Sequence, residues 1–438
     1  MSKRRTITPL ILFALLAGAG RSWAQTWSHR YDLPTTGRAV AQSGDGGYVV
    51  AGSQSSPSGT DILVLKVDAL GNSVWQATFD SPGLNGLAQF ISRTADGGFV
   101  VVGVLNGPGS SNALVLRLND FGGLIWQKAF GGPYDDGLSS VRETSDGGFV
   151  LAGQFQPLGG CIACTDAWVL RLDGSGNLLW SKTYGGTDED RLYEIEELPG
   201  GRFVAAGATR SSGAGAFDAF AILLDAGGNI VWQKTVGSRL DESAASLTLL
   251  SSGDIVLAGT SSTTTPTPPL DCDPIVIRLG SDGSVIWKKT YSVNGCGIAN
   301  AVRATSDGGV VVTGVLPGVS GNDGFMMKLD GNGRVQWWNR YDGGYDQQLY
   351  IPEQATDSGY IVAGESVGSL WLQKTDALGR TGASCPLVSS ISGDGKNNNL
   401  KVRDSQLTGP VTNGAPIVVS VSRSVPSPNF TELCPPSP

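Results

Sequence analysis

The chain has 438 residues and a formal net charge of −8, from 39 acidic and 31 basic side chains. An acidic chain repels phosphate backbones and anionic lipid surfaces, so we expect no nucleic-acid partner. The 63 glycines, and the lack of any long stretch with apolar residues at helical spacing, predict an all-β fold.

The first 24 residues have the layout of a secretory signal peptide. Three basic residues at positions 3–5 precede an apolar run at positions 9–16, and small residues lead to Ala24, where we expect cleavage. Removal of this segment, which also holds Arg21 and no acid, takes the formal charge from −8 to −12. No later segment reaches the length of about 18 apolar residues that a spanning helix needs. We therefore predict a secreted or periplasmic protein with no transmembrane segment.

Residues 25–380 consist of seven copies of a repeat of about fifty residues. Each copy has an apolar run that ends in glycine, and successive glycines are 50 to 55 residues apart, a spread that insertions in surface loops explain. These glycines are Gly52, Gly103, Gly153, Gly207, Gly259, Gly314 and Gly364. A period of this length is typical of propellers and other repeat architectures.

Each copy supplies four short strands. In the third copy we expect strands at 138–143, 149–152, 167–172 and 178–183, separated by Asp-Gly and Gly-Asn turns and one longer loop. The inner strands are apolar on both faces, as a blade packed between two neighbours requires. The pattern predicts a seven-bladed β-propeller of four-stranded antiparallel blades.

A tryptophan marks the fourth strand in six copies, and the seventh copy ends before it. The six are Trp75, Trp126, Trp180, Trp232, Trp287 and Trp337. At the other end of the chain, residues 26–31 match the fourth strand around Trp180. We predict that this N-terminal strand completes the last blade and closes the ring, which removes an open edge. Trp168, Trp338 and Trp371 fall outside the series, and the sequence does not place them.

The unit DGGYVVAG at 45–52, followed by D-x-x-x-x-K-V-D-x-x-G-x-x-x-W, resembles the repeats of bacterial extracellular propellers of unassigned function. Its second half, as in Leu172 to Trp180, also resembles the tryptophan-docking repeat of quinoprotein dehydrogenases. That second resemblance implies pyrroloquinoline quinone, a bound calcium, a catalytic aspartate and usually eight blades. The seven copies and the lack of an adjacent Cys-Cys pair depart from that family's pattern.

Six cysteines in an exported chain form an even set, and we expect disulfides. Cys272 and Cys296 lie in loops on the same face of one blade and are predicted to pair. Cys385 and Cys434 flank the C-terminal segment and are predicted to bridge it. Cys161 and Cys164 are interpreted as a loop-closing disulfide, with a redox centre as the alternative.

No metal site is predicted, because half a zinc site at this Cys-x-x-Cys pair would need two more nitrogen or sulfur ligands. The only histidine, His29, lies on the closing strand at a position held by lysine in other copies, which favours a blade-surface residue over a catalytic one. Residues 381–438 are rich in Ser, Asn and Pro, and we interpret them as an appendage tied back by the bridge between Cys385 and Cys434.

Acidic residues recur nine positions after the tryptophan, in the loops that join one blade to the next. We expect these residues and their neighbours to converge on one face around the channel, where propellers commonly bind ligands. The candidate ligand-binding residues are Tyr134, Asp135, Asp136, Asp188, Glu189, Asp190, Asp241, Glu242, Tyr345 and Asp346. They could hold a cation or a sugar, or form a carboxylate pair for glycoside chemistry. The structural alternative is that each acid caps its loop by accepting backbone N–H groups.

The leading interpretation is a secreted, non-enzymatic, monomeric propeller that binds an unidentified protein or glycan on the face of the inter-blade loops. A carbohydrate-active enzyme that uses the acidic residues of that face is the alternative. A quinone-dependent oxidoreductase comes third. We expect no cofactor, with calcium as the one possible exception.

Overall fold

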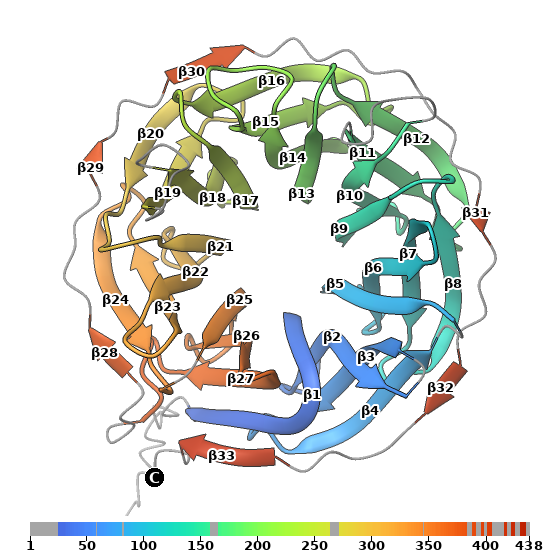
Figure 1. The fold of residues 1–438 in the computed structure, drawn as a ribbon, viewed down its shortest axis with the longest axis vertical. Coiled ribbons are helices and arrows are strands. Elements are labelled where there is room, and N and C mark those ends of the chain that lie inside the picture. Colours follow the sequence, from blue (N-terminus) through green and yellow to red (C-terminus); the bar gives the residue numbers. More distant parts are fainter. Residues whose placement is uncertain are drawn as a thin grey trace, which may run out of the picture.

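A computed structural model describes residues 25–57, 59–80, 83–157, 165–262, 271–344 and 346–382, together with six short strands between 388 and 434. The predicted class is confirmed: seven four-stranded antiparallel blades form a closed ring around a central axis (Figure 1). Across the described ranges, no helix is long and apolar enough to cross a membrane.

Within each of the first six blades the strands run outward from the axis in chain order, and in blade seven the first part of β1 takes the outermost place. The first three blades consist of part of β1 (Trp27–Gln42) with β2 (Tyr48–Ser56), β3 (Gly59–Val67) and β4 (Ser73–Asp80); β5 (Asn85–Arg93), β6 (Phe99–Gly107), β7 (Ser110–Leu118) and β8 (Leu124–Phe130); and β9 (Gly137–Glu143), β10 (Phe149–Phe155), β11 (Asp166–Leu172) and β12 (Leu178–Tyr184). The strands predicted for the third copy agree with β9 to β12 to within a few residues.

The other four blades repeat this order. They consist of β13 (Asp190–Leu198), β14 (Arg202–Thr209), β15 (Asp218–Leu224) and β16 (Ile230–Gly237); β17 (Glu242–Leu249), β18 (Ile255–Ser262), β19 (Cys272–Leu279) and β20 (Val285–Thr290); β21 (Ile298–Ala304), β22 (Val310–Pro317), β23 (Asn322–Leu329) and β24 (Val335–Tyr341); and β25 (Gln347–Gln354), β26 (Tyr360–Ser366) and β27 (Ser369–Thr375) with the first part of β1.

The strand β1 belongs to two blades and closes the ring. Its first part pairs with β27, with Trp27 opposite Lys374, and supplies the missing outer strand of blade seven. Its second part pairs with β2 as the innermost strand of blade one. The prediction that residues 26–31 complete the last blade is therefore confirmed. The ring has no unpaired edge at the junction of its first and last repeats.

The core lies between the blades. Seven clusters of buried apolar side chains fill the seven junctions, and each cluster draws on two neighbouring blades. The junction tryptophans also donate their indole N–H groups to carbonyl oxygens in a turn of the next blade; such bonds are given by Trp27, Trp126, Trp180, Trp232, Trp287 and Trp337. Trp168, Trp338 and Trp371, which the sequence did not place, are buried in the core.

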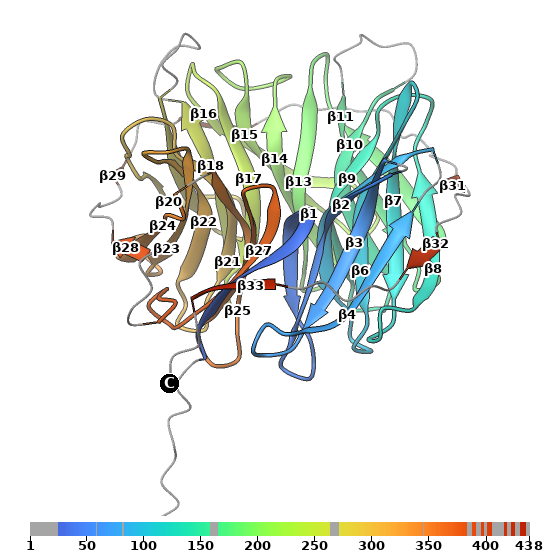
Figure 2. The same ribbon diagram turned by 60° about the horizontal axis from the view of Figure 1, so that its bottom comes forward.

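Six short strands described between residues 388 and 434 lie around the outside of the ring, and we call them the belt (Figures 1 and 2). Each described belt strand pairs antiparallel with an outermost strand, and the order of blades is the reverse of that in the propeller. The pairs are β28 (Val388–Ser390) with β24, β29 (Lys396–Asn397) with β20, β30 (Lys401–Asp404) with β16, β31 (Pro416–Ile417) with β8, β32 (Ser422–Ser424) with β4, and β33 (Phe430–Cys434) with β1.

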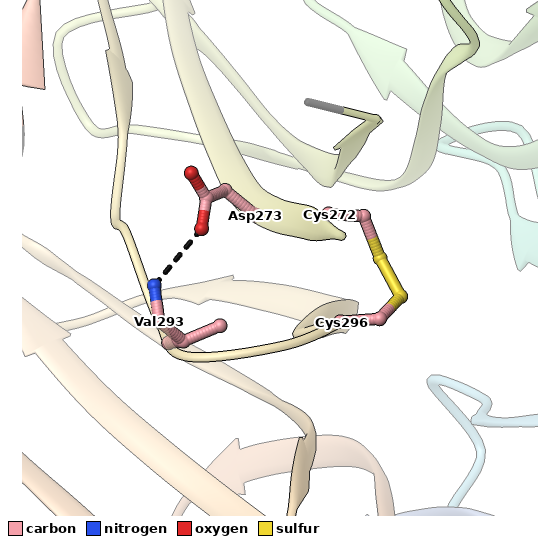
Figure 3. Close-up of a disulfide and its surroundings, with 4 residues drawn as sticks. All are labelled: Cys272, Asp273, Val293 and Cys296. Carbon is pink, nitrogen blue, oxygen red and sulfur yellow. Dashed lines mark hydrogen bonds between the residues drawn. A yellow bond between two sulfur atoms is a disulfide. The ribbon is translucent and has the colours of Figure 1, made fainter. Parts of the chain in front are cut away.

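The predicted disulfide between Cys272 and Cys296 is confirmed (Figure 3). It joins the start of β19 to the loop that leads into blade six, and beside it Asp273 accepts a hydrogen bond of 2.9 Å from the backbone N–H of Val293. Cys161, Cys164 and Cys385 lie outside the described residues, so their predicted bridges stay predictions.

Candidate functional site

Every innermost strand carries a β-bulge at the same place in the repeat. The bulged residues are Arg38, Gln89, Ser139, Tyr193, Ala245 and Asn300 in blades one to six, and Tyr350 with Ile351 in blade seven. A bulge bends a strand and re-aims one side chain, and bulges often lie next to functional sites. Residues from all seven bulges line one cavity on the axis.

The repeat glycine explains how the bulge is accommodated. A Cβ atom on Gly207 would overlap the carbonyl oxygen of Arg191, and one on Gly259 would overlap that of Ser243. The glycines at the same position in the other five copies meet a carbonyl oxygen of the innermost strand in the same way. Only glycine lets the two backbones approach this closely.

The bulged residues line a cavity of about 460 Å³ at the end of the channel where the inter-blade loops lie. This volume falls in the range of roughly 300–1,000 Å³ that small-molecule sites occupy. The polar lining comes from Arg38, Gln89, Ser139, Gln154, Tyr193, Glu194, Ser246, Asn300 and Tyr350. Hydroxyl and amide groups predominate, and Glu194 is the only acid among the lining residues.

Among the described residues that line the cavity, Arg38 is the one cation. Its guanidinium lies 4.7 Å from the centre of the Tyr350 ring. Among the residues whose side chains the structure describes, no carboxylate forms an ion pair with Arg38. The cavity therefore presents a guanidinium that contacts Tyr350 and has no described carboxylate within ion-pair distance.

An ion cluster forms the floor of this central cavity. Glu194, 2% exposed, accepts hydrogen bonds of 2.7 Å from Arg142 and 3.1 Å from Arg303, and another from the hydroxyl of Ser246. The ring of Phe90 lies 4.4 Å from the guanidinium of Arg142 and 5.8 Å from that of Arg303. Phe90 also lines a cavity of about 280 Å³ on the opposite side of this floor.

The electrostatics of the floor keep Glu194 ionised. Burial acts to raise the pKa of Glu194, but the guanidinium groups of Arg303 and Arg142 outweigh burial and hold the pKa below its usual range. A carboxylate held this way is a poor proton donor or acceptor near neutral pH. Its hydrogen bonds instead tie together blades three, four, five and six.

A side cavity of about 240 Å³ lies between blades four and five, on the same face. Tyr193 lines both this cavity and the central one. Arg191 and Phe217 form part of its wall, with the guanidinium 5.6 Å from the ring centre, and Arg191 also pairs with Glu189. Two of the acids that the sequence singled out, Asp241 and Glu242, belong to its lining.

The exposed members of the predicted acidic set hold neighbouring hairpins in place. Asp135 accepts the backbone N–H of Ser111 at 2.9 Å, and Asp241 accepts that of Phe217 at the same distance. Asp346 accepts the backbone N–H of Asn322 at 2.8 Å. Each of these bonds runs to the start of the third strand of the preceding blade, or to the residue just before it. The contacts match the loop-capping alternative, and a role in ligand binding stays a prediction.

The buried members close the loops themselves. Asp136, Asp190 and Glu242 accept the backbone N–H of the residue four positions earlier, at 2.5, 3.0 and 2.8 Å. Burial raises the pKa of all three carboxyl groups, that of Asp136 to about 6. In blade seven, Gln347 makes the same contact with Gly343 at 2.7 Å. An amide can replace the acid there, so the contact needs an acceptor and not a charge.

The remaining candidates are dispersed around the face. Tyr134 and Asp188 are exposed, and neither lines the central or the side cavity. Tyr345 lies outside the described residues. His29 is buried on β1, stacked on Trp27 with ring centres 4.6 Å apart, so the expectation of a surface residue was wrong.

The residues present do not fit a calcium-bound quinone. Within the described ranges, no three His, Cys, Asp or Glu side chains gather in a group that could hold a metal ion. In the central cavity the one carboxylate, Glu194, is already bound by two arginines. We therefore derive no step through such a group.

Comparison with known proteins assigns the chain neither a family nor an activity. No family model matches the chain, and no curated protein matches it. Similar solved structures include Sqt1 from Chaetomium thermophilum, with 10% identity and a TM-score of 0.46 over 79% of this chain and 98% of that chain. The polysaccharide lyase Uly1 has 10% identity and a TM-score of 0.45 over 78% of this chain and 90% of that chain. A glucose dehydrogenase has 14% identity and a TM-score of 0.39 over 66% of this chain and 95% of that chain. At these identities and scores, the likenesses carry no information about activity or ligand.

Proposed function

We propose that the chain is a secreted, non-enzymatic binding propeller, and that the central cavity on the inter-blade face holds an acidic sugar. The observation that carries the proposal is the set of seven bulges, which aims a side chain from every blade into one cavity of about 460 Å³. A repeated departure from regular pairing at the axis is hard to explain by stability alone, because a bulge leaves a residue out of the ladder.

The chemistry of the lining favours a ligand with one negative charge and several hydroxyl groups. Arg38 can bind a carboxylate through two parallel hydrogen bonds. The amides of Gln89 and Asn300 can each donate to and accept from a hydroxyl. The rings of Tyr193 and Tyr350 supply the flat apolar surfaces on which sugar rings can pack.

Binding is favoured over hydrolysis by the state of the carboxylates. Most glycoside hydrolases use two carboxyl groups about 5 to 10 Å apart across the scissile bond. In the central cavity Glu194 is the only acid, and it is fixed between Arg142 and Arg303. The loop acids Asp135 and Asp346 are engaged by backbone N–H groups of neighbouring hairpins.

The test is a binding measurement on the mature chain, residues 25–438. Isothermal titration calorimetry would compare galacturonic, glucuronic and mannuronic acid, and oligosaccharides that contain them, with their neutral counterparts. A hydrogen-bonded charge pair contributes about 1.5–3 kcal/mol, so at least one uronate ligand should bind roughly 10- to 100-fold tighter than its neutral counterpart. The variant Arg38→Gln should abolish this preference.

The control is Arg340→Gln. Arg340 is paired with Asp323 at 3.1 Å and lines neither the central nor the side cavity, so the preference should survive. Thermal unfolding would verify that both variants are folded. If no member of the panel binds, or if Arg38→Gln binds uronates as tightly as the wild type does, the proposed function is wrong.

A further inference from the structure

The central and side cavities are neighbours on one face. The innermost strand of blade four, β13, lines the side cavity with Arg191, both cavities with Tyr193 and the central cavity with Glu194. The innermost strand of blade five, β17, contributes Ser243 to the side cavity and Ser246 to the central one. One half-buried tyrosine ring, Tyr193, therefore stands between the two cavities and lines each of them.

The side cavity differs from the central one in its balance of charge. Its cation, Arg191, is already matched by Glu189. Its two acids, Asp241 and Glu242, are engaged in hydrogen bonds to backbone N–H groups. No lining cation is therefore left for a second anionic group, whereas the hydroxyls of Ser243, Thr260 and Ser262 can bind neutral ligand hydroxyls. This asymmetry distinguishes the two cavities by the charge of the unit that each can accept.

We propose that the ligand is an oligosaccharide in which an acidic unit in the central cavity is joined, across Tyr193, to a neutral unit in the side cavity between blades four and five. This inference rests on the proposed function and adds a length, a direction and a charge pattern to the ligand. Loops at the other blade junctions then serve the fold alone. Blades four and five form the side cavity, which extends the central cavity in one direction.

The test uses three classes of probe on the mature protein: a single uronic acid, aldobiouronic acids (one uronate linked to one neutral sugar), and diuronates. Calorimetry should show the best aldobiouronic acid binding at least tenfold tighter than its uronic acid, and tighter than the diuronate. The extra unit gains hydrogen bonds in the side cavity, while a second carboxylate meets Asp241 and finds no partner.

Two variants in the side cavity test the direction in which the bound oligosaccharide runs. Thr260→Val keeps the shape of the side chain and removes its hydroxyl, and Ser243→Ala removes the hydroxyl of a second lining residue. Each should weaken disaccharide binding about three- to tenfold and leave the single uronic acid unchanged. Tyr134→Ala is the matched control, because this exposed tyrosine lies on the same face but lines neither cavity, so it should change neither affinity.

The outcomes separate the two proposals. If the uronic acid binds, Arg38→Gln abolishes that binding and the aldobiouronic acid binds no tighter, the proposed function stands and this inference is overturned. If Tyr134→Ala weakens binding of the disaccharide while the side-cavity variants do not, the oligosaccharide runs toward another blade junction and the inference is again overturned. If no probe of any class binds, the proposed function itself fails.

Discussion

Replacing Glu194 with glutamine should destabilise the ring by about 3–5 kcal/mol, the usual cost of removing one partner from a buried ion pair. Glu194 is 2% exposed and binds Arg142 at 2.7 Å and Arg303 at 3.1 Å, so Glu194→Gln leaves two guanidinium groups facing an amide in the channel. Unfolding entropy is about 2.1 cal/mol/K per residue, so in a ring of about 360 residues this loss lowers the Tm by about 4–7 °C.

The matched control is Glu196→Gln. Glu196 pairs with the same Arg142 at 2.6 Å, but its side chain is 22% exposed. A pair at this more accessible position contributes about 1 kcal/mol or less, so the Tm should fall by about 1 °C. Thermal unfolding followed by circular dichroism measures both changes.

The effect of pH provides a second readout for the same variant. Because the pKa of Glu194 is lowered in the folded state, its ionised form stabilises the ring fully above the unfolded value of about 4.5. The stabilisation is lost as the pH falls through the lower, folded value. The Tm difference between wild type and Glu194→Gln should therefore be constant near neutral pH and shrink in acid. Equal losses for the two variants at pH 7, or a gap that widens in acid, would refute the assignment of the buried ion cluster.

Three further predictions follow from the fold. Truncation after Gly382 removes the belt, so hydrogen exchange should rise in the outermost strands β4, β16 and β24 but not in the innermost strands, and unchanged exchange in the outermost strands would contradict the pairing. Burial raises the pKa of Asp136 to about 6, so its ionisation lowers the free energy of unfolding as pH rises from about 4 to about 6. Denaturant titrations should show a smaller decrease in this free energy over that window for Asp136→Asn than for the wild type. Equal decreases would show that Asp136 is not the group responsible. In the same assay, Gly207→Ala should lower the free energy of unfolding by more than 2 kcal/mol because its Cβ meets a carbonyl oxygen. Gly200→Ala, at φ 86° with open space around it, should lower it by about 1 kcal/mol. Equal decreases would remove the steric reason for the repeat glycine.

The sequence was sufficient for the ring because the features that define a propeller recur. The repeat glycines, the Asp-Gly turns and the junction tryptophans each return about every fifty residues, and the match of residues 26–31 to the strand around Trp180 gives the closure. The pairing of Cys272 with Cys296 followed from strand order alone. Residues that have the same structural role in every blade therefore recur in the sequence.

The central cavity could not be read in the same way, because the residues that line it differ from blade to blade. Arginine, glutamine, serine, tyrosine, alanine and asparagine occupy the bulge in successive blades. One signal was present: from Arg38 and Gly52 to Tyr350 and Gly364, the bulged residue lies 14 positions before the glycine of its repeat. The bulged position keeps its spacing within the repeat while its residue type varies from blade to blade. We interpret this combination as the sign of a specialised surface.

The acidic set shows the opposite case. Asp135, Asp241 and Asp346 recur because each holds a hairpin of the preceding blade, so recurrence there reflects structure. The belt escaped prediction for another reason. Its strands are two to five residues long, and they exist only where an outermost strand offers free backbone groups to pair with.

The double role of β1 determines the order in which this chain can fold. Trp27 is among the first residues of the propeller to be synthesised, yet its partner Lys374 is among the last, so blade seven stays incomplete until the whole chain is available. Closing a loop of seven repeats instead of one adds only about 2 kcal/mol of chain entropy, so the delay affects the rate of folding more than the final stability. Until closure, the unpaired edge of β27 can accept β1 from a second chain as well as from its own, and the second chain competes better as its concentration rises. Refolding at high protein concentration is therefore the condition under which strand-exchanged dimers should form.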